Sequence, residues 1–522
     1  MFNKINNWIC LTFVSIIIFT IFLIYIWNFT VDDAYITFRY ALHIAQGQGI
    51  VWNVGESPVE GYTNLLWVIF SAVLIKLNMN PVLFTKIIGL GAVIGILYFY
   101  WKITIDFFDD KKLYFAAFAV ASAFLLINPA TAIHAVSGLE TAFYSFMIML
   151  IMYASYNLII LHERKYLYIF AIASLLISLL RPEGIIISLS LFIFTLVLFK
   201  IKNKYSLSFY IPFVLIYLVP LVGYMIFRIN YFNETFPLPF YVKAITYGEF
   251  LAILNGLSFI HVIPFILVIL LSILLIKLVW NQKSKIITKY YYLLAISLII
   301  IISANVIYIQ SAPIMNYAQR FFYPSFVLMY LLSSISIVIL FKELKSLSKI
   351  RLESIKYAFC ILLIIINLSF INDIQYDHFY GERLSAAHIA LGESLNSFSG
   401  YNYTIASVDA GAIPYFSRWN HLDTVGLNDK FIAKNKLATQ EYLEKKEPEL
   451  VLIISNSSES ITHYPTLEQP FLEFVQRKNY VQLAPIKFVD DYYLIPFLNP
   501  NVNDFEKISY NLQKVSECSL KN

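Results

Sequence analysis

Two adjacent carboxylates, Asp32 and Asp33, follow the first long apolar run of the chain and open a predicted helix. The helix is predicted because apolar residues recur at helical spacing as far as Ala45. A carboxylate pair in this position can act as a general base or hold a cation. The alternative is structural: an N-cap and a first-turn acid, which the helix dipole would stabilise. The sequence leaves both interpretations open.

The segment after this pair is rich in glycine and ends on another acid. Arg39 lies on the polar face of the predicted helix. The glycines from Gly47 to Gly55 follow no strand, so they indicate turns and not a dinucleotide-binding loop. Glu60 then leads into the next apolar segment.

Later loops add further acids and bases. The candidates are His134, Glu140, Arg181, Glu183, Lys243 and Arg320. Charged groups near lipid are costly unless they are paired or functional. Arg181 and Glu183 could form a local ion pair, and Lys243 and Arg320 could be interfacial anchors whose charged ends reach the headgroups.

The composition requires that these residues be positioned by membrane helices. Of 522 residues, 59% are hydrophobic and only 14% are charged, whereas soluble chains carry about 25% charged residues. The low charge density argues against a nucleic-acid partner. The three cysteines form neither a metal-ligand pattern nor a disulfide framework.

About eleven apolar segments have a length that suits membrane crossing. They are Trp8–Trp27, Val82–Trp101, Leu113–Ile127, Leu139–Leu158, Tyr166–Leu180, Gly184–Phe199, Phe209–Phe227, Phe259–Leu278, Tyr290–Ile309, Phe322–Phe341 and Tyr357–Ile371. Trp8–Trp27 is not followed by a cleavage site and is predicted to remain as the first span.

The lysine-rich loops alternate with loops poor in lysine and arginine, which sets the orientation in a cytoplasmic membrane. The N-terminus is expected in the cytoplasm, and the candidate residues and everything after Ile371 are expected outside. Tyr62–Leu77 is also apolar, but a span there would reverse every later loop. We therefore expect it to lie flat at the outer interface, within a first outer loop of residues 28–81.

The composition changes near Asn372, where acidic and polar residues return. A helix is expected at Gly381–Phe398 and helical structure near Asp429–Lys446. Strands are expected at Tyr403–Val408 and Leu450–Ile454, and two more within Tyr480–Pro496. The predicted organisation is a membrane domain, 1–371, and an extracytoplasmic α/β domain, 372–522.

Acids and bases gathered on one side of a membrane suit an enzyme that acts on a lipid-linked phosphate. Basic groups would hold the phosphate and a carboxylate would take a proton from the acceptor hydroxyl. A flippase or transporter of lipid-linked sugars is the main alternative, although ionisable residues in mid-helix and an internal repeat would then be expected. A non-catalytic membrane scaffold would leave the clustered acids and bases unexplained.

Several motifs resemble those of GT-C glycosyltransferases that use polyprenyl-phosphate sugars, in particular the terminal arabinofuranosyltransferase branch. The first block is Asp32-Asp33-Ala34-Tyr35-Ile36-Thr37-Phe38-Arg39, followed by Gly49-Ile50-Val51-Trp52-Asn53-x-Gly55-Glu56 and Val59-Glu60-Gly61-Tyr62-Thr63-Asn64. Further blocks are Ser137-Gly138-Leu139-Glu140-Thr141, Arg181-Pro182-Glu183-Gly184, Pro237-x-x-x-Tyr241-x-Lys243-Ala244, Asp409-Ala410-Gly411-x-Ile413-Pro414-Tyr415 and Asp423-x-x-Gly426-Leu427-Asn428-Asp429.

The resemblance implies an inverting, single-displacement transfer of a sugar to a cell-envelope glycan or a lipid-linked acceptor. In this reading Asp32 or Asp33 is the base, and Arg320, Lys243 and Arg181 bind the donor phosphate. The residues expected to orient substrates are Arg39, Glu60, His134, Glu140 and Glu183. No cofactor is required, although a divalent cation at Asp32 and Asp33 is compatible with the sequence. Asn316 stands where this branch carries an acid, which weakens the case for a metal or acid role of that loop.

Overall fold

The computed structural model describes residues 5–202, 207–243, 285–306, 315–346, 370–459, 461 and 466–521. The chain divides into two compact units. The first, called the helical unit here, comprises Met1–Trp27, Thr85–Met225 and Ile245–Tyr376. The second, called the sheet unit, comprises Asn28–Phe84, Ile226–Ala244 and Asp377–Asn522. The first outer loop therefore belongs to the same compact unit as the C-terminal region.

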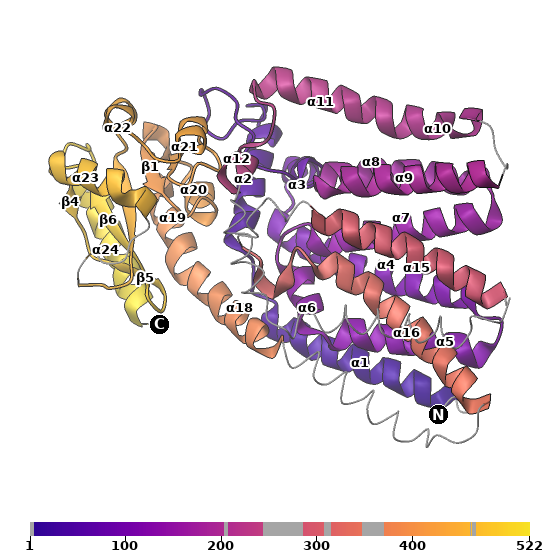
Figure 1. Cartoon of the computed structure of the whole chain (residues 1–522). Helices are drawn as coiled ribbons and strands as arrows, with labels where there is room; N and C mark the ends of the chain where they lie inside the picture. Colours follow the sequence, from indigo (N-terminus) through magenta and orange to yellow (C-terminus); the bar gives the residue numbers. More distant parts are fainter. Residues whose placement is uncertain are drawn as a thin grey trace. The chain divides into compact units, whose positions relative to one another are not determined.

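The helical unit consists of long helices that run side by side (Figure 1). They are α1 (Ile5–Ile26), α4 (Pro81–Phe107), α5 (Lys111–Ile127), α6 (Pro129–Val136), α7 (Thr141–Leu161), α8 (Arg164–Leu180), α9 (Glu183–Ile201), α15 (Lys285–Asn305) and α16 (Tyr323–Ser346). A further helical segment runs from η1 (Leu207–Tyr210) through α10 (Ile211–Phe213) and the π-helical η2 (Val214–Leu218) into α11 (Val219–Phe232).

Among the described residues, seven helices are long and apolar enough to cross a membrane. The number is eight when α5 and α6, which are bent by 65° at their junction, count as one span. Nine of the predicted apolar spans coincide with helices, including the 17-residue α8. The other two, 259–278 and 357–371, lie outside the described residues apart from Phe370 and Ile371, the second of which begins a later helix. The prediction of a polytopic helical membrane protein is confirmed.

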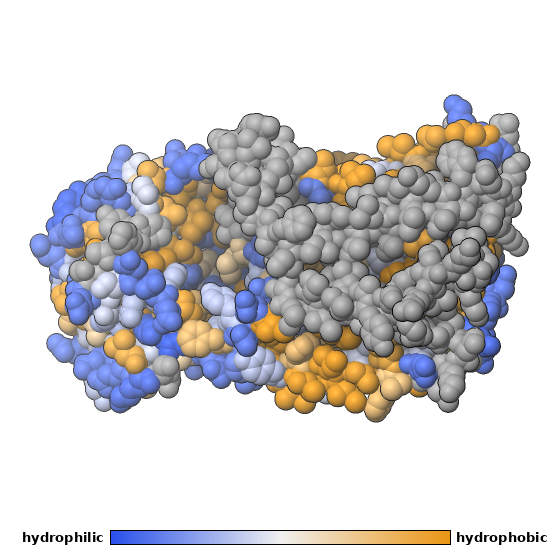
Figure 2. Space-filling view, turned by 60° about the horizontal axis from the view of Figure 1, so that its bottom comes forward, coloured by the Kyte–Doolittle hydropathy of each residue, from blue (hydrophilic) through white to orange (hydrophobic). Residues whose placement is uncertain are grey.

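The surface of these helices is apolar where they face outward. Large side chains such as Phe13 (63% exposed), Ile24 (72%) and Ile94 (67%) lie on α1 and α4. Figure 2 shows hydrophobic residues gathered over the visible membrane helices. A soluble protein seldom exposes so many large apolar groups, whereas a lipid-facing surface requires them.

The sheet unit begins with two helices of the first outer loop, α2 (Asp32–Ala45) and α3 (Leu65–Lys76), which pack on each other. The 12 residues of α3 extend over about 18 Å. A membrane core is about 30 Å thick, so α3 is too short to cross it upright. This length agrees with the prediction that Tyr62–Leu77 does not span.

The C-terminal part of the sheet unit is a mixed six-stranded sheet with helices, as predicted for an α/β domain. The strands are β1 (Thr404–Ser407), β2 (Asn420–Asp423), β3 (Leu450–Ser455), β4 (Val481–Gln482), β5 (Ile486–Val489) and β6 (Tyr492–Leu498), in the order β2-β1-β3-β6-β4 with β5 beside β6. β1 is parallel to β2 and β3, whereas β6 is antiparallel to β3, β4 and β5.

The described residues from Ile371 onward also form helices. They are α18 (Ile371–Leu384), η5 (Ser385–Ile389), α19 (Ala390–Leu395), η6 (Asn396–Tyr401), α20 (Ala412–Ser417), α21 (Lys430–Asn435), α22 (Gln440–Lys446), η7 (Thr466–Glu468), α23 (Gln469–Arg477) and α24 (Phe505–Lys521). β1, β3, β5 and β6 coincide with strands predicted from the sequence, whereas β2, α20, α23 and α24 were not predicted. β2 was missed because Asn420-His421-Leu422-Asp423 lacks the apolar run of a buried strand.

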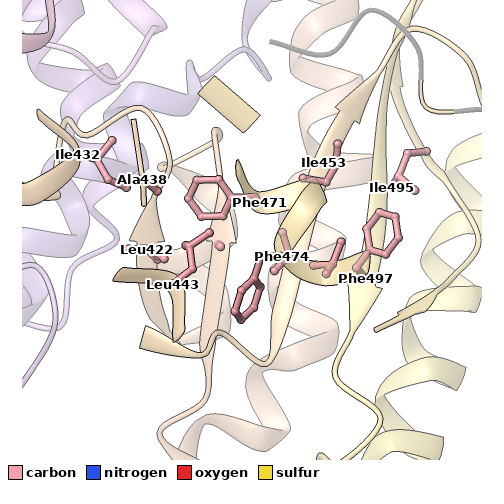
Figure 3. Close-up of a cluster of buried hydrophobic side chains, with 12 residues drawn as sticks. Leu422, Ile432, Ala438, Leu443, Ile453, Phe471, Phe474, Ile495 and Phe497 are labelled. Carbon is pink, nitrogen blue, oxygen red and sulfur yellow. The ribbon is translucent and has the colours of Figure 1, made fainter. Parts of the chain in front are cut away.

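The core of this domain lies between the sheet and α21, α22 and α23 (Figure 3). Phe471 and Phe474 of α23 belong to the same buried cluster as Ile453 of β3 and Phe497 of β6, and all four are almost fully buried. β3 is buried along its whole length, which explains why its sequence is continuously apolar and not alternating.

Candidate functional site

The predicted base pair lies at the N-terminus of α2, where both Asp32 and Asp33 belong to the first turn. The positive end of the helix dipole favours carboxylates in this turn. The N-cap is Val31, and no side chain caps the helix. Of the structural alternative, the first-turn position of the acids is confirmed and the N-cap is not, because Val31 occupies that position.

The two aspartates differ in environment. Asp32 is 7% exposed, and its carboxylate accepts hydrogen bonds from the backbone amides of Gly411 (2.9 Å) and Ala412 (2.8 Å). Asp33 is half-buried. Burial is the main reason that the pKa of Asp32 is raised to about 6, and the nearby charge of His388 opposes the shift. Both oxygens of Asp32 are thus engaged with backbone, while Asp33 is the more accessible carboxylate.

Near Asp32, the buried His388 lies close to the carboxylate of Asp409. His388 Nε2 lies 2.9 Å from Asp409 Oδ2, which also accepts a hydrogen bond from the hydroxyl of Tyr492 (2.8 Å). Burial alone would lower the pKa of His388, but the Asp409 carboxylate outweighs it and the net shift is upward. Asp409 belongs to a motif noted in the sequence, whereas no sequence signal singled out His388 or Tyr492.

Arg39 holds three segments of the sheet unit together. Its guanidinium donates to the backbone oxygens of Trp52 (3.0 Å), Trp419 (2.9 Å) and Pro414, and to the Asn53 side chain (3.1 Å). Arg39 is 3% exposed. These contacts give Arg39 a structural function, and its role in orienting a substrate stays a prediction.

Glu60 and Lys243 belong to the same unit. Glu60 is buried and lies 3.3 Å from the guanidinium of Arg228, a residue that the sequence analysis did not select. The Glu60 backbone oxygen also accepts from Leu238 at the start of α12 (Leu238–Lys243). Lys243 is half-buried at the end of this short helix.

In the helical unit, Arg181 contacts two other predicted site residues. Its Nε lies 2.7 Å from Glu140 Oε1, and its Nη1 lies 3.6 Å from Glu183 Oε1. Arg181 Nη2 donates to the Thr141 hydroxyl (3.0 Å). The predicted Arg181–Glu183 ion pair is confirmed, but the shorter contact is with Glu140, 41 residues away in sequence.

Arg320 and His134 lie around the loop before α16. The guanidinium groups of Arg320 and Arg181 are 5.1 Å and 5.8 Å from the ring of Phe321. The ring nitrogen Nε2 of His134 lies 3.0 Å from the backbone oxygen of Ala318. Ala318 has a φ of 42°, a conformation that costs energy for a residue with a Cβ. The helical unit therefore gathers His134, Glu140, Arg181, Glu183 and Arg320.

Within the described part of the chain, no group of three or more His, Cys, Asp or Glu side chains is arranged to hold a metal ion. The role of a divalent cation at Asp32 and Asp33 stays a prediction.

Solved structures share this fold, among them two of one protein. They are ArnT from Cupriavidus metallidurans in the apo state and the same protein bound to undecaprenyl phosphate, with TM-scores of 0.56 and 0.57. Each is 11% identical to this chain, and each alignment covers 95% of this chain and 98% of ArnT. The likeness shows that this chain shares the fold of ArnT over most of its length, including the membrane helices and the C-terminal α/β part.

Sequence comparisons match only part of the chain and give no function. A family model described as a domain of unknown function (DUF8728) matches residues 372–503, nearly all of which belong to the sheet unit. No curated protein matches the sequence.

Proposed function

We propose that this protein is a membrane glycosyltransferase that moves a sugar from a polyprenyl-phosphate donor to a hydroxyl group of a cell-envelope glycan or a lipid-linked acceptor. The observation that carries the proposal is the carboxylate pair at the start of α2, in a chain whose fold follows ArnT over 95% of its length. The ArnT structure with undecaprenyl phosphate supports a lipid donor of the same kind.

We assign the base to Asp33 and a positioning role to Asp32. Asp32 uses both oxygens to accept backbone amides, so its geometry is fixed by the protein. Asp33 is half-buried on the same turn of α2 and remains accessible to a substrate hydroxyl.

The reaction needs one displacement. Asp33 takes the proton of the acceptor hydroxyl while the acceptor oxygen bonds to the anomeric carbon of the donor sugar. The bond from that carbon to the phosphate oxygen breaks with inversion, and the electron pair leaves with the polyprenyl phosphate. Positive groups stabilise the phosphate as it leaves.

Arg320 and Lys243 are our candidates for that stabilisation. Arg181 already lies between two carboxylates, so much of its charge is balanced within the protein. Its proposed role is therefore to support the segment that carries Arg320, since both guanidinium groups approach Phe321. His134 contributes by holding the Ala318 carbonyl of the same segment.

The donor sugar, the location and the need for a cofactor are also part of the proposal. Arabinofuranose is the proposed donor sugar, because the sequence motifs resemble that branch most. The loop charges support a cytoplasmic membrane location with the active site and C-terminal domain outside. The mechanism requires no cofactor, and chelation with EDTA tests for a divalent cation.

The test is sugar transfer by the full chain in lipid nanodiscs, with a panel of polyprenyl-phosphate sugars and crude cell envelope as acceptor. Wild type is compared with Asp33→Asn and Asp32→Asn. Loss of a positioned general base lowers rates by about 10²–10⁴-fold, and we expect Asp33→Asn to show this loss with an unchanged melting temperature.

Full activity of Asp33→Asn would remove Asp33 from the mechanism. The absence of transfer with every donor, together with passage of the lipid-linked sugar across the bilayer, would favour the flippase instead.

A further inference from the structure

A cleft of about 820 Å³ opens within the sheet unit. Its walls come from the first outer loop, from the end of α11 and from the segment that contains α21 and α22. Ligand-binding sites commonly measure about 300–1,000 Å³, so the cleft has room for several sugar residues. None of the predicted site residues lines it.

Aromatic rings form part of its wall. Phe431 and Tyr442 stack on each other with their centroids 4.2 Å apart and their planes at 9°. The Tyr442 hydroxyl donates to Asp429 Oδ2 (2.6 Å), which fixes the ring. Trp52 and Tyr231 line the cleft as well. Fixed aromatic faces suit a ligand that has one apolar face and a polar edge.

The charges of the cleft are balanced. Three lysines line it, and each lies close to a carboxylate. Lys430 and Lys434 lie 2.5 Å and 2.7 Å from Glu234 Oε1, which is nearly buried behind them. Lys446 lies 2.5 Å from Glu56 Oε1. With Asp429 also in the wall, three carboxylates oppose three lysines, so the cleft does not select for an anion.

The polar groups are held in fixed positions. The buried carboxylate of Asp423 accepts from the backbone amide of Asn428 and from its side-chain amide, both at 2.9 Å. The Asn428 side chain also contacts the Tyr40 hydroxyl on α2 (3.1 Å). Asn53 donates to Glu56 Oε2 (3.0 Å) and pairs with the backbone of His421. A preorganised site loses less entropy on binding.

From these features we infer that the cleft binds a neutral stretch of the acceptor saccharide. Sugar hydroxyls would donate to Glu56, Asp429 and Asn428 and accept from the lysines, while the CH face of a ring packs on Tyr442. This inference rests on the proposed transferase function, because it names the acceptor site of that reaction.

The cleft is connected to the proposed base by α2. Tyr40, which contacts Asn428, lies seven residues after Asp33, which is about 10 Å along a helix. A saccharide chain held at Asn428 can therefore extend toward Asp33 over a short distance. The two sequence motifs at 49–56 and 423–429 thus meet in one binding surface.

The experiment measures binding separately from transfer. Fluorescently labelled short arabinan, galactan and mannan chains and, as an anionic comparator, poly(glycerol phosphate) are titrated onto the full chain in nanodiscs. The Asp33→Asn variant serves as the background, so that turnover does not consume the ligand. Ser57→Trp fills the cleft, Tyr442→Ala removes an aromatic face, and Ser458→Trp adds the same bulk at an exposed position that does not line the cleft.

We expect at least one neutral glycan to bind. Ser57→Trp and Tyr442→Ala should each raise its Kd by about tenfold or more, whereas Ser458→Trp should leave the Kd unchanged. In active protein, Ser57→Trp should raise the acceptor KM with little change in donor KM. Preference for poly(glycerol phosphate), failure of all neutral glycans to bind, or equal affinity in Ser57→Trp would each overturn the inference. Cleft-dependent binding without transfer from any donor would refute the transferase function and leave the saccharide site standing.

Discussion

The carboxylate of Asp32 accepts the backbone amide of Gly411 at 2.9 Å, across 379 residues of sequence. The contact joins the first turn of α2 to the N-terminus of α20. The protein itself therefore fixes the Asp32 carboxylate, whereas the neighbouring Asp33 is half-buried.

Gly411→Ala is predicted to disrupt this junction. A Cβ at position 411 would lie 2.1 Å from the Asp32 backbone oxygen and 2.4 Å from its Oδ2. Neither the helix backbone nor a hydrogen-bonded carboxylate can move away at low cost. We expect a lower melting temperature and faster proteolysis of the sheet unit. Gly400→Ala is the matched control, because a Cβ there meets nothing within 4 Å, and equal stability of the two variants would contradict the prediction.

Asp32→Asn is predicted to lower stability more than it lowers the chemical rate. An asparagine keeps one acceptor oxygen, but its NH₂ group faces a backbone amide that then has no acceptor. A buried donor left without a partner costs about 1–3 kcal/mol. Thermal unfolding and kcat, measured beside Asp33→Asn, separate the two roles. The assignment fails if Asp32→Asn melts like wild type and loses transfer as Asp33→Asn does.

The membrane helices and the central strands could be predicted because their signals are local. β3 is a continuous apolar run, and α2 has helical spacing directly after Asp32 and Asp33. The site could be predicted only as a set of residues. The Arg181–Glu183 ion pair could be predicted because the two residues are two positions apart in the sequence. The shorter contact of Arg181 with Glu140 depends on how α7 and α8 pack.

The sheet unit contains the partners that sequence reasoning could not find. Arg39 was expected to face a substrate, yet it donates to the backbone oxygens of Trp52 and Trp419. Every residue type has a backbone oxygen, so the sequence does not show which ones accept from Arg39. His388 is a single histidine in a helical stretch, and its pairing with Asp409 depends on the fold. Hydrogen bonds to backbone oxygens and contacts between residues far apart in the sequence could therefore not be predicted.

Arg181 and Glu140 are predicted to be energetically coupled. Both side chains are at most 4% exposed and lie 2.7 Å apart, and removing one member of a buried ion pair costs about 3–5 kcal/mol. We expect Glu140→Gln and Arg181→Gln each to lower the melting temperature strongly. The double variant should lose less unfolding free energy than the two single variants lose together. The difference, which is the coupling energy of the pair, should be about 0.5–3 kcal/mol.

The control for this cycle is the exposed pair of Lys165 and Glu163. Glu163→Gln should leave the melting temperature unchanged, because water screens such a pair. Additive losses for Glu140→Gln and Arg181→Gln would show that the buried contact contributes no coupling.

Glu468 is predicted to make the sheet unit less stable as the pH rises. It is fully buried, and burial raises its pKa from 4.5 to about 8, with the Asp409 charge adding to the shift. Between these two values the folded state keeps a proton that the unfolded state has released. The free energy of unfolding should therefore fall by up to about 1.4 kcal/mol per pH unit from pH 4.5 to 8, and level off above it.

Melting curves from pH 5 to 9 test this, with Glu468→Gln as the variant. Glutamine keeps an oxygen that can accept the Ile454 amide, as Glu468 Oε2 does at 2.9 Å, but it does not titrate. The pKa values of Asp32 and His388 are also raised, so these groups likewise lower the free energy of unfolding as the pH rises. Both groups are present in wild type and in Glu468→Gln. The difference between the two pH profiles therefore reports on Glu468 alone. We expect a flatter pH profile for Glu468→Gln and a wild-type profile for the exposed control Glu473→Gln. Identical slopes in wild type and Glu468→Gln would mean that this carboxyl group is ionised on both sides of the unfolding transition.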